Sequence, residues 1–345
     1  MRRALLSVLT LLFVAAAAAA IYWQHTNQVM QAAGPNREPV ALEVKPGASV
    51  RAVLAELDEK GALAERRAVE LQLRVRGAPA IKTGRYSIPA GASPAEILRQ
   101  LEEGRVVLET LTVVEGWTFA DMRRVIEAHP QLRITLRDRD AAGIMEAIGH
   151  RGEHPEGRFF PDTYRFAAGT TDRDLYALAY RKMAEALDSA WSSRAANLPL
   201  KDPYEALILA SIVEKETGLA SERPRIAGVF VTRLRRNMRL QTDPTVIYGI
   251  GASYDGNIRE RDLRTDTPYN TYTRGGLPPT PIALPSREAI EAVTHPMETG
   301  DIFFVATGAG DGSHVFSATL EAHNAAVARY LARLRGQRLK GNGSR

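Results

Sequence analysis

The sequence contains no cysteine among its 345 residues. A disulfide framework, a thiolate nucleophile and a cysteine-ligated metal site are therefore excluded. The zinc motif HExxH, the phosphate-binding P-loop, a GxGxxG fingerprint after a strand and the serine elbow GxSxG are also missing, and the seven histidines are scattered. We therefore predict neither a metal site nor a cofactor.

Charge of one sign is not concentrated anywhere in the chain. The formal net charge is +5 and the isoelectric point about 9.4, from basic residues spread along the whole sequence. No basic helix with interleaved aromatic residues occurs, so we predict no nucleic-acid partner, whereas a mildly basic surface would suit an anionic polymer. The length and a 45% hydrophobic fraction predict two globular domains plus an anchor.

One long hydrophobic run is present, at residues 4–23, and it follows Arg2 and Arg3. Twenty residues suffice to cross a bilayer as a helix, and Tyr22 and Trp23 stand where interfacial aromatic residues belong. The arginines predict a cytoplasmic N-terminus and export of everything after the run. A cleaved signal peptide is the alternative, because the alanines offer A-x-A sites. The length of the run and its Ile-Tyr-Trp end favour a retained anchor.

An internal repeat follows the anchor. Residues 45–61 align with 89–105 at an offset of 44, and Ser49 matches Ser93. Each copy is typical of a short strand, a glycine turn, a serine N-cap and an amphipathic helix, and 113–129 carries a shorter version of the pattern. The predicted strands are 40–44, 84–88 and 108–114. Units of this size indicate a small α+β module.

The rest of the chain predicts a larger α+β domain. Residues 157–166, GRFFPDTYRF, form either core strands or a wall on which sugars stack. The long region 251–288 has no secondary-structure pattern of its own, which is typical of a functional loop. The expected helices are 172–196, 203–217, 222–237 with Ser221 as its cap, and 320–334, and the expected strands are 302–308 and 311–317.

The helix predicted at 203–217 is almost wholly apolar in its middle. Asp202 is suited to cap its start, Pro203 to its first position, and Gly218 follows its end. A core helix of this kind ordinarily carries charge only on its solvated last turn.

Two glutamates near the end of this helix differ in their surroundings. Because each residue turns about 100°, Glu214 lies roughly 200° round the axis from Glu216. Glu216 continues an apolar line that consists of Leu209, Ile212 and Val213. A carboxyl that leaves water beside apolar groups has a raised pKa, as a general acid near neutral pH requires. The alternative is that both glutamates sit on the solvated last turn.

Polar and aromatic residues in the following loops could hold a carbohydrate. Hydrogen-bonding groups and flat rings build such sites, although the same residues are common in turns. Beside one acid on a buried helix they indicate glycan cleavage. The candidates are Gln241, Thr242, Asp243, Tyr248, Tyr269, Asn270, Thr271 and Tyr272.

Six motifs in order resemble the endolytic murein transglycosylase family, the YceG-like proteins. They are ASIVEKET (210–217), SER (221–223), RLQTDPTVIYG (239–249), TPYNTY (267–272), GLPPTPI (276–282) and HVFSATLEAHN (314–324). The resemblance extends over nearly the whole chain, including the anchor and EGRFFPDTYRF. It implies the following organisation: cytoplasmic end 1–3, transmembrane anchor 4–23, tether 24–40, LysM-like repeat module 41–105, connecting region 106–160 and YceG-like catalytic domain 161–340.

The resemblance also implies an activity. The family's catalytic acid, the second glutamate of its ExE pair, corresponds to Glu216. The implied reaction is lytic cleavage of the MurNAc–GlcNAc β-1,4 bond within peptidoglycan strands, which leaves a 1,6-anhydro-MurNAc end and terminates nascent strands. The implied location is the inner membrane, with a periplasmic catalytic domain. Glycan strands are the implied substrate, and peptidoglycan synthases of the penicillin-binding protein type are candidate partners.

Two alternatives remain open from the residues. A hydrolytic muramidase would need a second carboxylate, for which Asp243 and Asp162 are available. A membrane-tethered peptidoglycan-binding scaffold would use the repeat module and need no acid.

Overall fold

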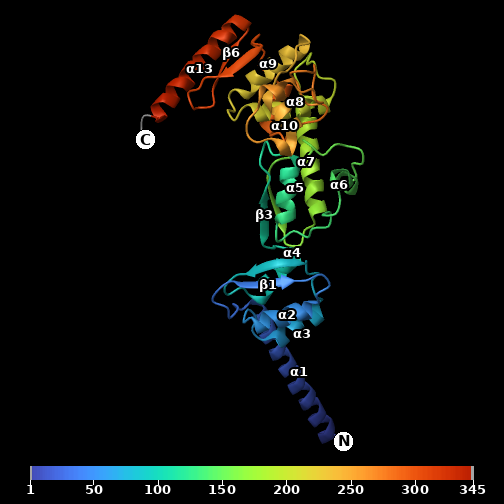
Figure 1. Cartoon of the computed structure of the whole chain (residues 1–345). Helices are drawn as coiled ribbons and strands as arrows, with labels where there is room; N and C mark the ends of the chain where they lie inside the picture. Colours follow the sequence, from blue (N-terminus) through green and yellow to red (C-terminus); the bar gives the residue numbers. More distant parts are fainter. Residues whose placement is uncertain (1, 343–345) are drawn as a thin grey trace. The chain divides into compact units, whose positions relative to one another are not determined.

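The computed structural model describes residues 2–342 (Figure 1). Met1 and residues 343–345 lie outside the described residues, as do the side chains of Arg2 and Arg3, which belong to the predicted cytoplasmic end. The chain combines helices with small two-stranded sheets, so the α+β prediction is confirmed. It forms two compact units, which are Met1–Glu109 with Arg165–Thr170, and Thr110–Tyr164 with Thr171–Arg345. The predicted connecting region thus groups, from Thr110 on, with the C-terminal unit.

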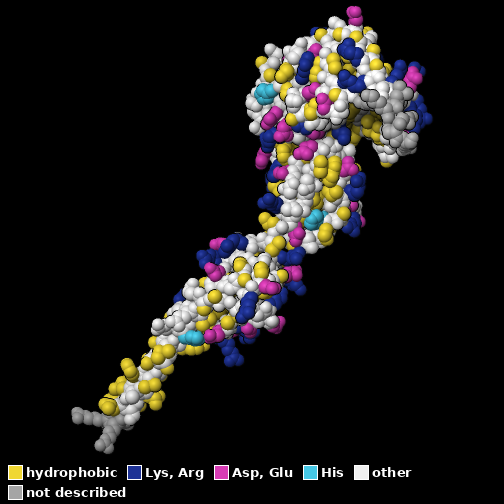
Figure 2. Space-filling model, turned by 90° about the vertical axis from the view of Figure 1, so that its left-hand side faces the viewer, with side chains coloured by type: hydrophobic (Ala, Val, Ile, Leu, Met, Phe, Trp, Pro, Cys, Tyr) yellow, Lys and Arg dark blue, Asp and Glu magenta, His cyan; other side chains and the backbone are white. Residues whose placement is uncertain are grey.

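Helix α1 (Arg2–Gln31) contains the predicted anchor. Its segment Leu5–Gln31, with a mean hydropathy of 2.4, is long and apolar enough to cross a membrane. Figure 2 shows hydrophobic side chains along its outer end. The helix does not stop at residue 23, as the predicted tether required. It continues because Thr26, Val29 and Met30 share one helix face and are buried in the N-terminal unit.

The N-terminal unit is built around one antiparallel strand pair, β1 (Val40–Val44) with β2 (Gly84–Ile88). Helices α2 (Val50–Glu59), α3 (Arg66–Arg76) and α4 (Pro94–Glu103) complete it. Ser49 caps α2 by accepting the Ala52 amide at 3.2 Å, and Ser93 closes a capping box on α4. The predicted strand–turn–helix repeat is therefore present, with both serines in the predicted role.

The C-terminal unit begins with α5 (Phe119–Ala128), α6 (Ala141–Ala147) and α7 (Asp172–Ser192). Strands β3 (Leu108–Thr112) and β4 (Thr163–Ala167), each of which contains residues of both units, pair with each other. Phe159 and Tyr164 are buried, so these aromatic residues of 157–166 belong to the core. Helix α7 ends four residues before the predicted position, because the Ala195 amide donates instead to the Thr294 carbonyl at 2.8 Å.

Helices α8 (Pro203–Glu216), α9 (Arg223–Arg235) and α12 (Arg287–Thr294) pack with α7 around the main core. Residues 206–213 of α8 are all buried, and Asp202 caps α8 by accepting the Glu205 amide at 2.9 Å. The prediction that Ser221 caps the next helix is wrong. Glu222 occupies the cap position of α9 without a capping bond, because its carboxylate binds His314.

The remaining elements surround this core. They are α10 (Asp243–Ile250), the 3₁₀ turn η1 (Gly251–Ser253), α11 (Glu260–Arg264), the antiparallel strands β5 (Phe303–Ala306) and β6 (His314–Ser317), and α13 (Leu320–Asn342). The region 251–288 is therefore not free of secondary structure, since it holds η1 and α11. Helix α13 packs along β5 and β6 and extends past the predicted end at 334 (Figure 1).

Candidate active site

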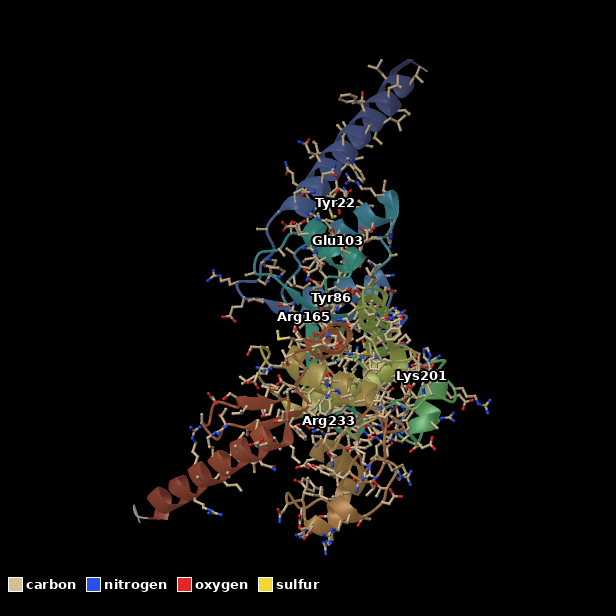
Figure 3. All side chains as sticks on the ribbon, turned by 90° about the horizontal axis from the view of Figure 1, so that it is seen from above. Tyr22, Tyr86, Glu103, Arg165, Lys201 and Arg233 are labelled. Atoms are coloured by element: carbon tan, nitrogen blue, oxygen red, sulfur yellow. The ribbon has the colours of Figure 1, made fainter. Side chains whose placement is uncertain are left out.

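Glu216 is the last residue of α8 and opens into a cavity of about 480 Å³. We call this the Glu216 cavity. It is lined by residues of α8, α9, the segment before α10, the loop after α11, β5 and α13: Glu216, Arg233, Leu240, Gln241, Thr242, Asp243, Tyr272, Phe303, Phe304, Leu320, His323 and Asn324. Figure 3 labels Arg233, which α9 contributes. A cavity of this size accommodates one or two sugar rings.

Thr242 positions the Glu216 carboxyl. Its hydroxyl donates a hydrogen bond to Oε1 of Glu216. Thr242 stands at the N-cap of α10, yet it makes no capping bond, because its hydroxyl is directed to the acid instead. Its own amide donates to Oγ1 of Thr271 at 3.1 Å, and the preceding residue, Gln241, has a φ of 50°. This left-handed backbone turns the chain so that the threonine faces α8.

Burial raises the pKa of Glu216 to about 7. Desolvation is the main cause, and the negative charge of Asp243 raises the pKa further. The Thr242 hydrogen bond and the electrostatic effects of His314 and Arg233 lower the pKa of Glu216. The carboxyl therefore exchanges its proton near neutral pH, which is what a group acting first as acid and then as base requires.

Two further groups set the polarity of the Glu216 cavity. Tyr272 donates its phenolic proton to Oδ1 of Asp243 at 2.5 Å. The buried guanidinium of Arg233 donates to the carbonyls of Leu240 and Ile302, each at 2.7 Å. Arg233 thereby fixes the segment before Thr242 to the residue that precedes β5 and brings a positive charge near Glu216.

Glu214 has a different task. Its side chain is only 5% exposed, accepts from the amide and the hydroxyl of Ser286, and pairs with Arg223 at 3.3 Å. Ser286 in turn caps α12. Glu214 therefore joins α8 to the start of α12 and to α9, and it does not line the Glu216 cavity.

The structure brings half of the predicted contact residues to Glu216. Gln241, Thr242, Asp243 and Tyr272 line its cavity. The other four do not line it, and their side chains bond to other groups. Tyr248 donates to Glu156 at 3.0 Å, Tyr269 bonds to Thr280 at 2.9 Å, Asn270 donates to three backbone carbonyls, and Thr271 bonds to Thr242 and Thr245.

The sequence prediction missed several other residues that line the cavity. Phe303 stacks on the imidazole of His323, with ring centroids 4.9 Å apart, and Arg233 lies 5.3 Å from the centre of the same phenyl ring. Nδ1 of His323 is buried and has no hydrogen-bond partner among the described residues. The sequence did contain a signal for two of these residues, because His323 and Asn324 end the motif HVFSATLEAHN.

Glu156 is a second buried carboxyl that the sequence did not single out. It accepts from the Phe119 amide at 2.9 Å and from Tyr248 at 3.0 Å, and burial raises its pKa to about 7. It lies outside the Glu216 cavity. Within residues 2–342, no group of three or more acidic or histidine side chains is placed to hold a metal ion.

Comparison with known proteins gives consistent matches. The profile of the YceG-like family matches residues 42–329. The chain is 28% identical over 314 residues to the endolytic murein transglycosylase of Bacillus subtilis (strain 168), a match that covers 86% of each protein. It is 26% identical over 332 residues to the endolytic murein transglycosylase of Streptococcus pneumoniae (strain D39), covering 86% of this chain and 59% of that relative.

A solved structure also resembles the chain. It is a crystal structure of a yceG-like protein from Listeria monocytogenes, 27% identical in sequence. The TM-score is 0.50, and the match covers 84% of this chain and 99% of that one.

Proposed function

We propose a function from the premise that the chain belongs to the YceG-like family. The protein is an endolytic peptidoglycan lytic transglycosylase, which is a lyase. It cleaves the MurNAc–GlcNAc β-1,4 bond within glycan strands and leaves 1,6-anhydro-MurNAc ends. The observation that carries the proposal is the Glu216 carboxyl, which has a pKa near 7, is held by Thr242 and opens into a cavity of about 480 Å³. The matched relatives named endolytic murein transglycosylases support it.

Glu216 performs both proton transfers in the proposed mechanism. In its protonated form it donates to the glycosidic oxygen as the C1–O bond breaks. As a carboxylate it then removes the proton of the MurNAc 6-hydroxyl, whose oxygen closes on C1. The nucleophile belongs to the substrate, so the attack is intramolecular and has a large proximity advantage. One acid is enough, unlike in ordinary glycosidases.

The residues around Glu216 have supporting roles in this proposal. Asp243 raises the pKa of Glu216, and its negative charge would also favour positive charge developing at C1. Gln241 and Asn324 offer amides to the hydroxyl groups of a sugar. Tyr248, Tyr269, Asn270 and Thr271 support the loops that present these groups.

The hydrolytic alternative depends on a second carboxylate. Asp162 pairs with Lys182 at 2.5 Å and does not line the Glu216 cavity, whereas Asp243 does. Asp243 is therefore the candidate base for a hydrolytic muramidase. A lytic enzyme yields anhydro ends and a hydrolytic one yields reducing ends, so the products separate the two.

We further propose that α1 anchors the protein in the inner membrane as a single pass. Arg2 and Arg3 keep the N-terminus cytoplasmic, and the catalytic unit is periplasmic. The repeat module, residues 41–105, would hold glycan near the membrane without chemistry of its own. Cleavage at this location would terminate nascent strands, beside synthases of the penicillin-binding protein type.

The deciding experiment is mass spectrometry of products from purified glycan strands treated with the protein. Internal cleavage with 1,6-anhydro-MurNAc ends is expected. Reducing ends would establish the hydrolytic alternative. Binding without cleavage by a correctly folded protein would establish the scaffold alternative.

A further inference from the structure

A second cavity lies in the C-terminal unit and shares no lining residue with the Glu216 cavity. Its volume is about 650 Å³. We call it the Lys215 cavity. It is lined by residues of α5, α8, α10 and the loops beside them: Thr118, Ala120, Asp121, Arg124, Glu156, Lys215, Pro244, Ile247, Tyr248, Gly251, Ala252, Tyr254 and Ile282.

The two cavities lie close together because they share two helix ends. Lys215 and Glu216 are consecutive residues at the end of α8, and Asp243 and Pro244 are consecutive residues at the start of α10. Consecutive Cα atoms are 3.8 Å apart. Because successive helix residues point about 100° apart, the two cavities lie on different sides of these helix ends, and a ligand that enters both must be branched.

One positive charge in the Lys215 cavity is open to a ligand. Arg124 pairs with Asp121 at 2.9 Å, and the oxygens of Glu156 accept from the Phe119 amide and Tyr248. Nζ of Lys215 donates to the Gly116 carbonyl at 3.1 Å, and within residues 2–342 it has no carboxylate partner. An ammonium with donors to spare favours an anionic ligand group.

The rest of the wall is apolar and aromatic. Ile247, Ile282 and Ala252 supply aliphatic surface, and Tyr248 and Tyr254 supply rings. Such a wall can pack against the methyl groups of a short chain while Lys215 pairs with a carboxylate of the same chain.

We propose that the Lys215 cavity binds the acidic peptide stem of the sugar whose glycosidic bond lies at Glu216, with Lys215 pairing to a stem carboxylate. This inference rests on the proposed function and adds a substrate feature to it. The enzyme would then favour strands that still carry their stems over strands from which an amidase has removed them. Lys215 acts in binding and takes no part in proton transfer.

The test compares Lys215→Gln with the unaltered protein on strands with stems and on strands stripped by an amidase. The variant should lose about tenfold in kcat/KM on strands with stems, the value of one charged contact, and should be unchanged on stripped strands. Lys215→Arg should retain most of the preference. The control is Lys201→Gln just before the start of α8, where Lys201 is exposed and, among the described residues, pairs with Glu205.

Equal losses on both substrates, or no loss on either, would overturn the inference. A binding measurement keeps it independent of cleavage. The Glu216→Gln protein should sediment more strongly with intact sacculi than with amidase-treated sacculi, and the added Lys215→Gln change should abolish that difference. If the unaltered protein cleaves neither substrate, the proposed function fails, while the sedimentation difference still decides whether stems are bound.

Discussion

The hydroxyl of Thr242 donates a hydrogen bond to Oε1 of Glu216, and this contact joins the end of α8 to the residue before α10. Thr242 is itself held by the Thr271 hydroxyl, which accepts its amide at 3.1 Å. The acid therefore points into its cavity because a loop far along the chain fixes one of its oxygens. Two helix ends and one loop must be correctly placed before the carboxyl can work.

Replacing Thr242 by valine removes this hydrogen bond and keeps the side-chain shape. This hydrogen bond favours the charged form of Glu216. Without it, the pKa of Glu216 should rise and the alkaline limb of the pH–rate profile should shift to higher pH. A less ordered carboxyl should also lower kcat by about tenfold. Steady-state kinetics across pH would measure both effects. Thr242→Ser retains the hydroxyl and should restore the profile; a profile that does not move in the valine variant would contradict the assigned role.

Glu216→Gln should abolish cleavage while leaving the fold and glycan binding intact. The amide matches the carboxyl in shape but transfers no proton, a loss worth about 10²–10⁴-fold or more, because one residue plays both parts. Anhydro-muropeptide yield measures the loss. Glu214→Gln is the matched control and should remain active, although weakening the contacts with Ser286 and Arg223 should cost about 1–3 kcal/mol of stability. An inactive Glu214→Gln beside an active Glu216→Gln would reverse the assignment.

The raised pKa of Glu216 also makes stability depend on pH. Between the ordinary glutamate pKa of 4.5 and about 7, the folded state retains a proton that the unfolded state has lost. Stability contributed by this group is therefore present at low pH and is lost as the pH rises through that window. The Glu216→Gln variant buries no charge at this position. When the pH is raised from 5 to 8, its free energy of unfolding should therefore increase by on the order of 1–3 kcal/mol relative to that of the unaltered protein.

Thermal or denaturant unfolding at the two pH values measures this difference. Glu156, whose pKa is also raised to about 7, is present in both proteins and cancels in the comparison. The same stability difference at pH 5 and pH 8 would rule out a buried, proton-holding Glu216.

Gly228 in α9 lies where a neighbouring segment approaches the helix. A Cβ added there would lie 2.1 Å from the carbonyl oxygen of Met297, a backbone atom that cannot move aside cheaply. Gly228→Ala should therefore destabilise the C-terminal unit by about 1–3 kcal/mol or more. Gly336→Ala on α13 meets no atom within 4 Å and should stabilise by up to about 1 kcal/mol. Denaturant unfolding of the two variants measures both changes in the free energy of unfolding. Similar changes in the two variants would contradict the close approach at Gly228.

The continuation of α1 into the N-terminal unit predicts where the anchor can be removed. A chain that begins at residue 24 keeps Thr26, Val29 and Met30, and with them the hydrogen bond from Gln72 to Thr26 at 2.6 Å. A chain that begins at residue 33 lacks all of these contacts. The first should be folded and soluble, and the second should show weaker hydrogen-exchange protection in α3. Equal protection would mean that the buried face of α1 adds no stability.

Much of the fold follows from local sequence. The serines at 49 and 93 and Asp202 cap the helices that their positions predicted, because a cap depends only on the first turn that follows it. The apolar run at the N-terminus likewise predicts a helix that can span a membrane. Ser221 fails as a cap because its neighbour Glu222 is engaged by His314, a residue 92 positions away.

The same division holds for the active site. The helical face already distinguished Glu216 from Glu214, since the turn per residue is a local property, and the structure places the two carboxyls in different surroundings. The sequence alone identified the polar and aromatic residues after α8 as candidates for contact with a carbohydrate. Only the tertiary structure decided that Thr242, Asp243 and Tyr272 reach the acid, while Tyr248 and Asn270 bond elsewhere. The physical reason is that long-range packing, which no local pattern encodes, sets the direction of each loop side chain and thereby the burial that raises the pKa of Glu216.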